Sequence, residues 1–394
     1  MVLTNSGVDG SPATTYGVDY ERRDIDVSSK IAQLMPDITP FLTILMKAKK
    51  QTTTSSQFIW YEDEPEDWWT TLSGSYVAGD TTISVNKASI FSPKDLVKNT
   101  ATGEVMFVNS VDTAGGTITV TREYGYDADW STGTQAADSS TASDNLLKLG
   151  NAMEENSLSP ESRIKQPNKE WNLIQTFRTP FEGSFDNEKE AKKTNESPRT
   201  RARRRKARQH RLEIERQLMF GERMDHSDEE RRTTGGLTQF IKENVYDVGA
   251  ENGGTLTEAQ FMNYLEELFQ WGSDSKLFIG SLSILRIIND FAKDHLELAP
   301  TDDTYGLNLK RYLTPFDTEL YLSSSKLFKY DYSGFGMGLD LDNINYKVFA
   351  GRDSTLRTNI QEPDRDGWKD EYMTKAGLKL EQEKTHGIIT GVTG

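Results

Sequence analysis

One stretch of this sequence, residues 197–221, constrains the fold more than any other because it predicts a long helix too basic to be buried on all sides. Ser197 can cap the first turn, Pro198 suits the first helical position, and Gly221 predicts a left-handed stop. The 23 residues between these caps would form a rod of roughly 35 Å. Nine of them are basic: Arg199, Arg201, Arg203, Arg204, Arg205, Lys206, Arg208, Arg211 and Arg216. Such a helix either binds nucleic acid or serves as a long, half-exposed strut.

The composition argues against nucleic-acid binding as the main role. The 394 residues carry a net charge of -15, whereas a protein that binds nucleic acid without sequence preference needs a basic surface. The 17 Phe, 15 Tyr and 7 Trp indicate a folded chain, long enough for two or three units with separate cores. The absence of cysteine excludes disulfides and thiolate metal sites, and no apolar run approaches the ~18 residues of a membrane span. We therefore expect a folded protein with no membrane partner.

A search for catalytic and cofactor motifs predicts neither an enzyme nor a cofactor or metal site. The four histidines, His210, His226, His295 and His386, lack the spacing of metal ligands, and no nucleophile elbow or phosphate loop occurs. Residues 333–343 contain three glycines, but these do not have the dinucleotide-binding spacing, and the aspartates that follow only begin a calcium loop. We interpret this stretch as a flexible loop.

The order of predicted elements describes a mixed α+β chain with a small all-β unit. Besides the basic helix, helices are expected at 27–35, 41–48, 145–155, 258–272 and 282–291, the fourth opening on a capping box of Thr257 and Gln260. Strands are expected at 57–61, at several places between 73 and 122, and at 171–185, 276–280, 319–322, 327–330, 346–349, 371–381 and 387–392. Several units are thus threaded through one another.

An acidic and aromatic stretch, residues 60–69, is the second unusual feature. Its members are Trp60, Glu62, Asp63, Glu64, Glu66, Asp67, Trp68 and Trp69. Tryptophans stack on sugar rings and paired carboxylates cleave glycosides, so one interpretation is a sugar site. Carboxylates on a single loop rarely have the required separation across a cleft. We favour a contact between subunits, in which these acids meet basic residues of a neighbour.

The first 35 residues are polar and cannot form a core alone. A polar arm of this kind is ordered only when something holds it, and a neighbouring subunit is the simplest candidate.

The order of the parts resembles that of major capsid proteins of tailed bacteriophages with the Hong Kong 97 fold, in the branch that carries a β insertion in its extended loop. The matching stretches are TPFL at 39–42, FIWYEDE at 58–64, GEVMFV at 103–108, TITVTREYG at 117–125, LGNAMEE at 149–155, NLIQTFRTPFEGS at 172–184, the basic helix, TTGGL at 233–237 and the strands of 372–392. The likeness covers nearly the whole chain.

This resemblance implies an α+β fold with named parts. They are an N-terminal arm (1–35), the start of a peripheral domain (36–51), an extended loop (52–72 and 145–190), a β insertion domain (73–135), the spine helix with the peripheral domain (191–250), an axial domain (251–340) and closing strands (341–394). The basic helix would be the spine helix.

The resemblance also implies a function, that of a capsid subunit which assembles into pentamers and hexamers around double-stranded DNA. Such a protein is built in the host cytoplasm and resides in the virion. Its partners would be further copies of itself, separate scaffold, portal and decoration proteins, and packaged DNA through weak contact. Candidate inter-subunit contacts are Glu62, Asp63, Glu64, Glu66, Trp68, Trp69, Arg201, Arg204, Arg205 and Arg208. The alternative is a nucleic-acid-binding protein that uses the helix of 198–220.

Overall fold

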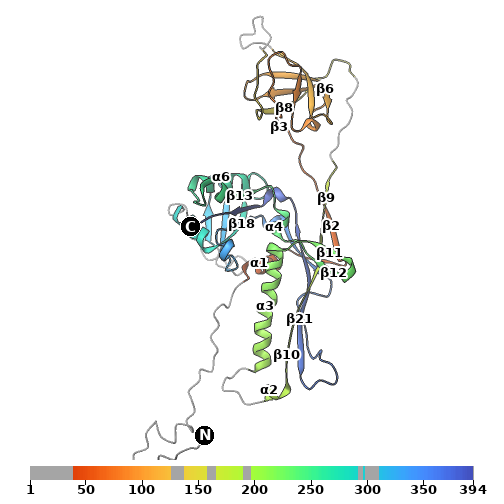
Figure 1. Ribbon diagram of the computed structural model, residues 1–394, viewed down its shortest axis with the longest axis vertical. Helices are drawn as coiled ribbons and strands as arrows, with labels where there is room; N and C mark the ends of the chain where they lie inside the picture. The colour runs from red at the N-terminus through yellow and green to blue at the C-terminus, as the bar shows by residue number, and fades with distance from the viewer. Residues whose placement is uncertain are drawn as a thin grey trace, which may run out of the picture. The chain divides into compact units, whose positions relative to one another are not determined.

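The computed structural model describes residues 39–125, 137–157, 166–189, 197–291, 296–297 and 310–393. The chain divides into two compact units, one formed by residues up to Trp60 together with those from Lys169 onward, the other by Tyr61–Asn168 (Figure 1). The predicted arm of 1–35, with its expected helix at 27–35, lies outside the described residues.

A five-stranded sheet and one long helix organise the first unit. The sheet contains β1 (Lys50–Thr53), β19 (Ile344–Phe349), β21 (Trp368–Leu380) and β10 (Gln175–Gly183) in that order, and β20 (Thr355–Arg357) also pairs with β21. Strand β21 runs antiparallel to both β10 and β19. Helix α3 (Pro198–Phe220) lies along β10 and β21 (Figure 1), and α1 (Pro40–Ala48) packs beside it. The predicted helices at 41–48 and 198–220 are confirmed.

A seven-stranded sheet forms the other half of this unit. Its order is β13 (Val245–Asp247), β22 (Gly387–Thr390), β18 (Gly336–Leu339), β14 (Ser275–Gly280), β17 (Glu319–Ser324), β16 (Lys310–Leu313) and β15 (Leu296–Glu297). Helices α6 (Glu258–Phe269) and α7 (Leu282–Phe291) share a core with Phe278 of β14. Because side chains alternate along a strand, Leu277 and Ile279 face the opposite way, into the core that also holds α1 and α3. The capping box at Thr257 is confirmed.

Two predictions in this region are wrong. The expected strand at 327–330 is a turn followed by a 3-10 helix at Tyr330–Tyr332, because Phe328 is buried against Phe220 and Phe335 rather than placed in a sheet. The expected flexible loop at 333–343 contains β18, which pairs with both β14 and β22. Its glycines allow close packing, since a Cβ on Gly338 would lie 2.6 Å from Leu268 of α6.

Shorter elements complete the unit. They are β2 (Gln57–Glu62), which pairs with β9 (Asn168–Leu173), α2 (Phe185–Lys189), the hairpin of β11 (Met224–His226) and β12 (Arg231–Thr233), α4 (Leu237–Phe240) and α5 (Val248–Asn252). The expected strands at 57–61 and 171–185 are confirmed by β2, β9 and β10.

The second unit is a closed β-barrel. Its strands follow the order β3 (Trp69–Thr71), β8 (Asn145–Asn151), β5 (Asp95–Asn99), β6 (Val105–Asp112), β7 (Thr117–Thr121) and β4 (Thr82–Ser84). A bridge between Leu72 and Val85 joins the first strand to the last and closes the barrel. The compact unit covers Tyr61–Asn168, whereas the β insertion was expected at 73–135.

The helix predicted at 145–155 is wrong, because this stretch forms β8. Strand β8 lies between β3 and β5 and pairs with both. Leu146 is fully buried in the barrel core, while Leu149 is half exposed. Two-sided pairing with distant strands therefore overrides a local preference for helix.

A buried carboxyl group joins α1 to α3. Helix α1 begins with Pro40 and has no side-chain cap from Thr39. Glu215 of α3 takes that role, since its Oε2 accepts a hydrogen bond from the Leu42 amide at 3.2 Å. Burial raises the pKa of Glu215 to about 8, although its bonds to the amides of Leu42 and Phe41 oppose the rise. At neutral pH the folded protein therefore favours the protonated form.

We predict that Glu215→Gln removes part of the pH dependence of stability. The ordinary pKa of this side chain is 4.5, so between that value and about 8 the folded state binds the proton more tightly than the unfolded state. The free energy of unfolding should then fall as the pH rises through this window in the native protein, and fall less in the variant. Urea unfolding of unassembled subunits at pH 5 and pH 8.5 measures this difference. Parallel pH profiles would contradict the assignment.

Candidate subunit-contact surfaces

Helix α3 is buried mainly in its C-terminal half and carries a basic, exposed face in its N-terminal half. The buried residues are His210, Ile214, Glu215, Leu218 and Met219. Arg201, Arg204 and Arg205 are exposed and Arg208 is half-buried, and their spacing of three and four residues places them along one side of the helix. The side chain of Ser197 accepts a hydrogen bond from the Thr200 amide, so the predicted N-terminal cap is confirmed. The four candidate arginines thus form one surface, which we call the basic face.

Two other arginines of α3 bind within the subunit. Asp370 of β21 is fully buried and accepts hydrogen bonds from Arg199 at 2.6 and 2.9 Å and from Arg203 at 2.8 and 3.0 Å. The Asn359 amide donates to the same carboxylate at 3.1 Å. Burial alone would raise the pKa of Asp370, but the bonds from Arg199, Asn359 and Arg203 outweigh it and hold the pKa below its ordinary value. This cluster, the Asp370 clasp, fixes the first turns of α3 to the sheet.

A buried imidazole makes a second link between α3 and the sheet. His210 Nδ1 lies 2.9 Å from the hydroxyl of Thr179 on β10, and Nε2 lies 2.7 Å from the hydroxyl of Thr374 on β21. Burial lowers the pKa of His210, and the nearby Glu213 partly offsets this. A neutral ring therefore bridges two strands, which gives this histidine a structural role.

Gly221 ends the helix differently from the prediction. Its backbone is extended, with φ -71° and ψ 152°, rather than left-handed. Glycine is needed here because a Cβ would overlap the side chain and carbonyl oxygen of Gln217. The Gly221 carbonyl accepts a bond from the Gly236 amide at 2.7 Å, which holds the turn at 233–237 against the end of the helix.

The acidic stretch presents two tryptophans and several carboxylates to solvent. Trp68 and Trp69 are 65% and 50% exposed. Asp63 and Glu66 are exposed, while Glu62 and Glu64 are half-buried. Trp60 is different, because it is buried beside Phe58 and Phe240. The candidate residues from Glu62 to Trp69, which we call the acidic loop, run from the last residue of β2 through the connection to the first residue of β3.

The described residues contain neither a candidate metal site nor a helix that could span a membrane. No group of three or more His, Asp or Glu side chains in that part of the chain could hold a metal ion. None of the helices described is long and apolar enough to cross a membrane.

Sequence reasoning missed the residues that hold α3 in place. Asp370 lies 171 positions from Arg199, and Thr374 lies 164 positions from His210. The sequence did offer one signal, which is that Asp370 directly precedes a predicted strand. A buried carboxylate requires a charged or hydrogen-bonding partner. The identity of that partner depends on which strand lies under α3.

Comparisons with known proteins were consistent with each other. A family model described as SU10 major capsid protein matches residues 11–393. The fold is similar to the capsid of a native GTA particle, with a TM-score of 0.50, 9% identity, and coverage of 97% of this chain and 100% of the other. It is also similar to a structure from Mycobacterium phage Bobi, with a TM-score of 0.50, 9% identity, and coverage of 98% and 100%. No curated protein matches the sequence.

We predict that Asp370→Asn destabilises the subunit by about 3–5 kcal/mol, the usual effect of breaking a buried ion pair by removing one partner. Arg205→Gln on the basic face serves as the control and should change the free energy of unfolding by no more than about 0.5 kcal/mol. Denaturant unfolding of unassembled subunits measures both. Equal effects of the two substitutions would contradict the division of α3 into two faces.

Proposed function

The chain belongs to the SU10 major capsid protein family and is therefore a structural subunit of a tailed-bacteriophage capsid, and we propose from this premise how its copies assemble. Pentamers and hexamers form in the host cytoplasm and close into a shell around double-stranded DNA. Separate scaffold, portal and decoration proteins take part. The observation that carries this proposal is the family match, which spans nearly the whole chain.

The units of the structure support an assignment of capsid domains. The five-stranded sheet with α3 would be the peripheral domain, and the seven-stranded sheet with α6 and α7 the axial domain. Strands β2 and β9 would belong to the extended loop, and the barrel of Tyr61–Asn168 would be the insertion domain. Residues 1–35 would be the N-terminal arm.

We propose that the acidic loop of one copy docks on the basic face of α3 in a neighbour. Opposite charges attract across this contact, and Trp68 and Trp69 each offer a large apolar area to bury. A single exposed ion pair contributes only ~0–1 kcal/mol, so the contact depends on repetition through the shell. Because salt screens exposed charges, this contact should weaken as the ionic strength rises.

The alternative functions are weaker. The comparisons give no support to a nucleic-acid-binding protein that uses the helix of 198–220, and Arg199 and Arg203 are committed to Asp370. The sugar-site interpretation requires carboxylates that face each other across a cleft, whereas these lie on one loop. Packaged DNA would meet the shell only through weak contact, consistent with the net charge of -15.

We predict that charge reversal blocks assembly and that a matching reversal restores it. Arg201→Glu with Arg205→Glu should leave folded subunits that form no shells, because the basic face would repel the acidic loop. Glu64→Lys with Glu66→Lys, added to the same chain, should recover shells. Arg286→Glu on the exposed side of α7 is the control. Electron microscopy and sedimentation measure the outcome, and normal shells from the first variant would contradict the contact.

We also predict that deletion of residues 1–35 leaves folded subunits but prevents closed shells. The core residues of α1 begin at Phe41, after this segment. Circular dichroism should show native secondary structure while electron microscopy shows open or absent shells. Shells indistinguishable from the native ones would refute a role for the arm.

A further inference from the structure

Three connections carry the described chain between the five-stranded half and the seven-stranded half of the first unit. They are residues 241–244 between α4 and β13, residues 340–343 between β18 and β19, and residues 381–386 between β21 and β22. The two halves also share the apolar core that contains α1 and α3. A polar group that binds these connections to one another therefore couples the two halves beyond what the shared core does.

The connection of residues 381–386 binds both of the others. The side chain of Asn244, in the first connection, donates a hydrogen bond to the carbonyl of His386 at 3.0 Å. The side chain of Asn343, in the second, donates to the hydroxyl of Thr385 at 3.2 Å. The three connections thus meet in one polar layer, and residues 381–386 lie in its middle.

His386 is fully buried in this layer, and its partners determine which ring nitrogen carries the proton. Its Nδ1 accepts a hydrogen bond from the Asp340 amide at 3.1 Å, and its Nε2 lies 3.3 Å from the carbonyl oxygen of Glu381. A backbone amide can only donate and a backbone carbonyl can only accept. The ring is therefore neutral, with the proton on Nε2.

We propose that His386 is a proton-sensitive latch that holds the three connections together when neutral and releases them when it takes up a proton. Protonation places a hydrogen on Nδ1, which then faces the N–H of Asp340, so that two donors oppose each other. Neither group can turn to become an acceptor. Residues 381–386 and the start of β22 must move away from Asp340, while the shared apolar core keeps the rest of the unit folded.

The surroundings of His386 already disfavour the charged ring. Burial has the largest effect and lowers the pKa of His386 from 6.5 to about 4. The carboxylate of Asp340, at the end of β18, and the bond to Glu381 oppose this shift, whereas the ammonium group of Lys276, on β14, adds to it. Lys276 is itself buried and donates to the carbonyls of Leu268, Trp271 and Thr385.

The other charged groups of the three connections are bound to other partners. Glu383 accepts hydrogen bonds from the amides of Lys242 and Glu243, and Glu381 accepts one from the side chain of Asn345. Lys384 lies 4.0 Å from Glu243, and Asp342 lies 3.0 Å from Lys49. The effect of pH on the latch is therefore assigned to the ring of His386.

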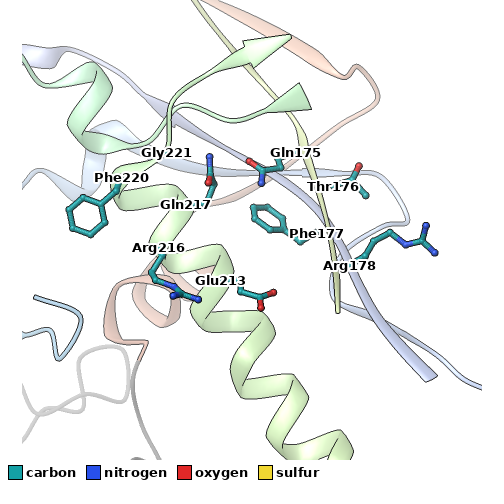
Figure 2. Close-up of a pocket in the computed structure, with 9 residues that line it drawn as sticks. All are labelled: Gln175, Thr176, Phe177, Arg178, Glu213, Arg216, Gln217, Phe220 and Gly221. Atoms are coloured by element: carbon teal, nitrogen blue, oxygen red, sulfur yellow. The ribbon is translucent and has the colours of Figure 1, made fainter. Parts of the chain in front are cut away.

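The second buried histidine, His210, has partners of a different kind. Its two nitrogens contact the hydroxyls of Thr179 and Thr374, and a hydroxyl can rotate to accept instead of donate. Thr179 also donates to Glu213, which lines an open groove of about 540 Å³ between α3 and β10 (Figure 2). A proton on His210 can thus be accommodated by rotation of hydroxyl groups, whereas a proton on His386 cannot.

The release has a defined pH window. When the polar layer opens, the imidazole of His386 meets water and regains its ordinary pKa of 6.5, above the value of about 4 in the closed state. The latch is therefore fully closed above pH 6.5 and weakens as the pH falls toward 4. Because opening takes up one proton, the opening constant should rise up to about tenfold per pH unit within this window.

Hydrogen–deuterium exchange of full-length, unassembled subunits tests the latch. Between pH 6.5 and pH 4.5, after correction for intrinsic exchange rates, protection of residues 336–343 and 387–392 should fall up to about tenfold per pH unit. Protection of residues 198–220, in α3, should change several-fold less.

A matched pair of variants assigns the effect to one ring. In His386→Asn the side-chain oxygen can replace Nδ1 as the acceptor for the Asp340 amide but takes up no proton, so the pH dependence at residues 387–392 should disappear. His226→Asn, on the half-exposed hairpin of β11 and β12, is the control and should keep the native pH dependence.

Three results would overturn the proposal. They are protection of residues 387–392 that does not change with pH in the native chain, an unchanged pH dependence in His386→Asn, and an equal loss of protection in α3, which indicates global unfolding. If His386→Asn does not fold, the comparison of residues 387–392 with α3 in the native chain still decides. All these measurements use unassembled subunits, so their outcome is independent of the proposed assembly.

Discussion

The fold of the larger unit depends on how α3 is held against the sheet of β10 and β21. Packing α3 against a protein core gains little free energy from apolar burial, because nine of its residues are basic. The Asp370 clasp resolves this problem by neutralising Arg199 and Arg203 in a buried site, and His210 adds hydrogen bonds to both strands. With these side chains bound inside, Arg201, Arg204, Arg205 and Arg208 are left to form the basic face. The same helix can thus be anchored internally and remain available to a neighbour.

A second dependence links the N-terminal side of the chain to this helix. Helix α1 has no cap of its own, and Glu215 supplies one from the buried side of α3. Since burial raises the pKa of Glu215 to about 8, the junction is sensitive to pH. Residues 1–38 precede α1 in the chain. The proposed N-terminal arm is therefore joined, through α1 and Glu215, to the helix α3 that carries the proposed subunit contact.

Sequence reasoning was successful where the signal was local. The N-terminal cap and length of α3, the capping box at Thr257 and most strands follow from patterns within a few residues of one another. It was wrong where tertiary packing decided the outcome. Residues 145–151 became a strand through pairing on both sides, and the glycines of β18 proved to be packing positions under α6 rather than signs of a flexible loop. The candidate arginines were found as a group, but their separation from Arg199 and Arg203 required knowledge of Asp370, which is distant in sequence.

The central claim is that α3 is a strut with one face bound to its own subunit and one face bound to a neighbour. Cryo-electron microscopy of assembled particles, at a resolution that shows side chains, tests it most directly. The account predicts that Asp370 contacts Arg199 and Arg203 of its own chain while residues 62–69 of an adjacent copy cover Arg201, Arg205 and Arg208. A basic face that lies against packaged DNA, or in open solvent throughout the shell, would contradict it.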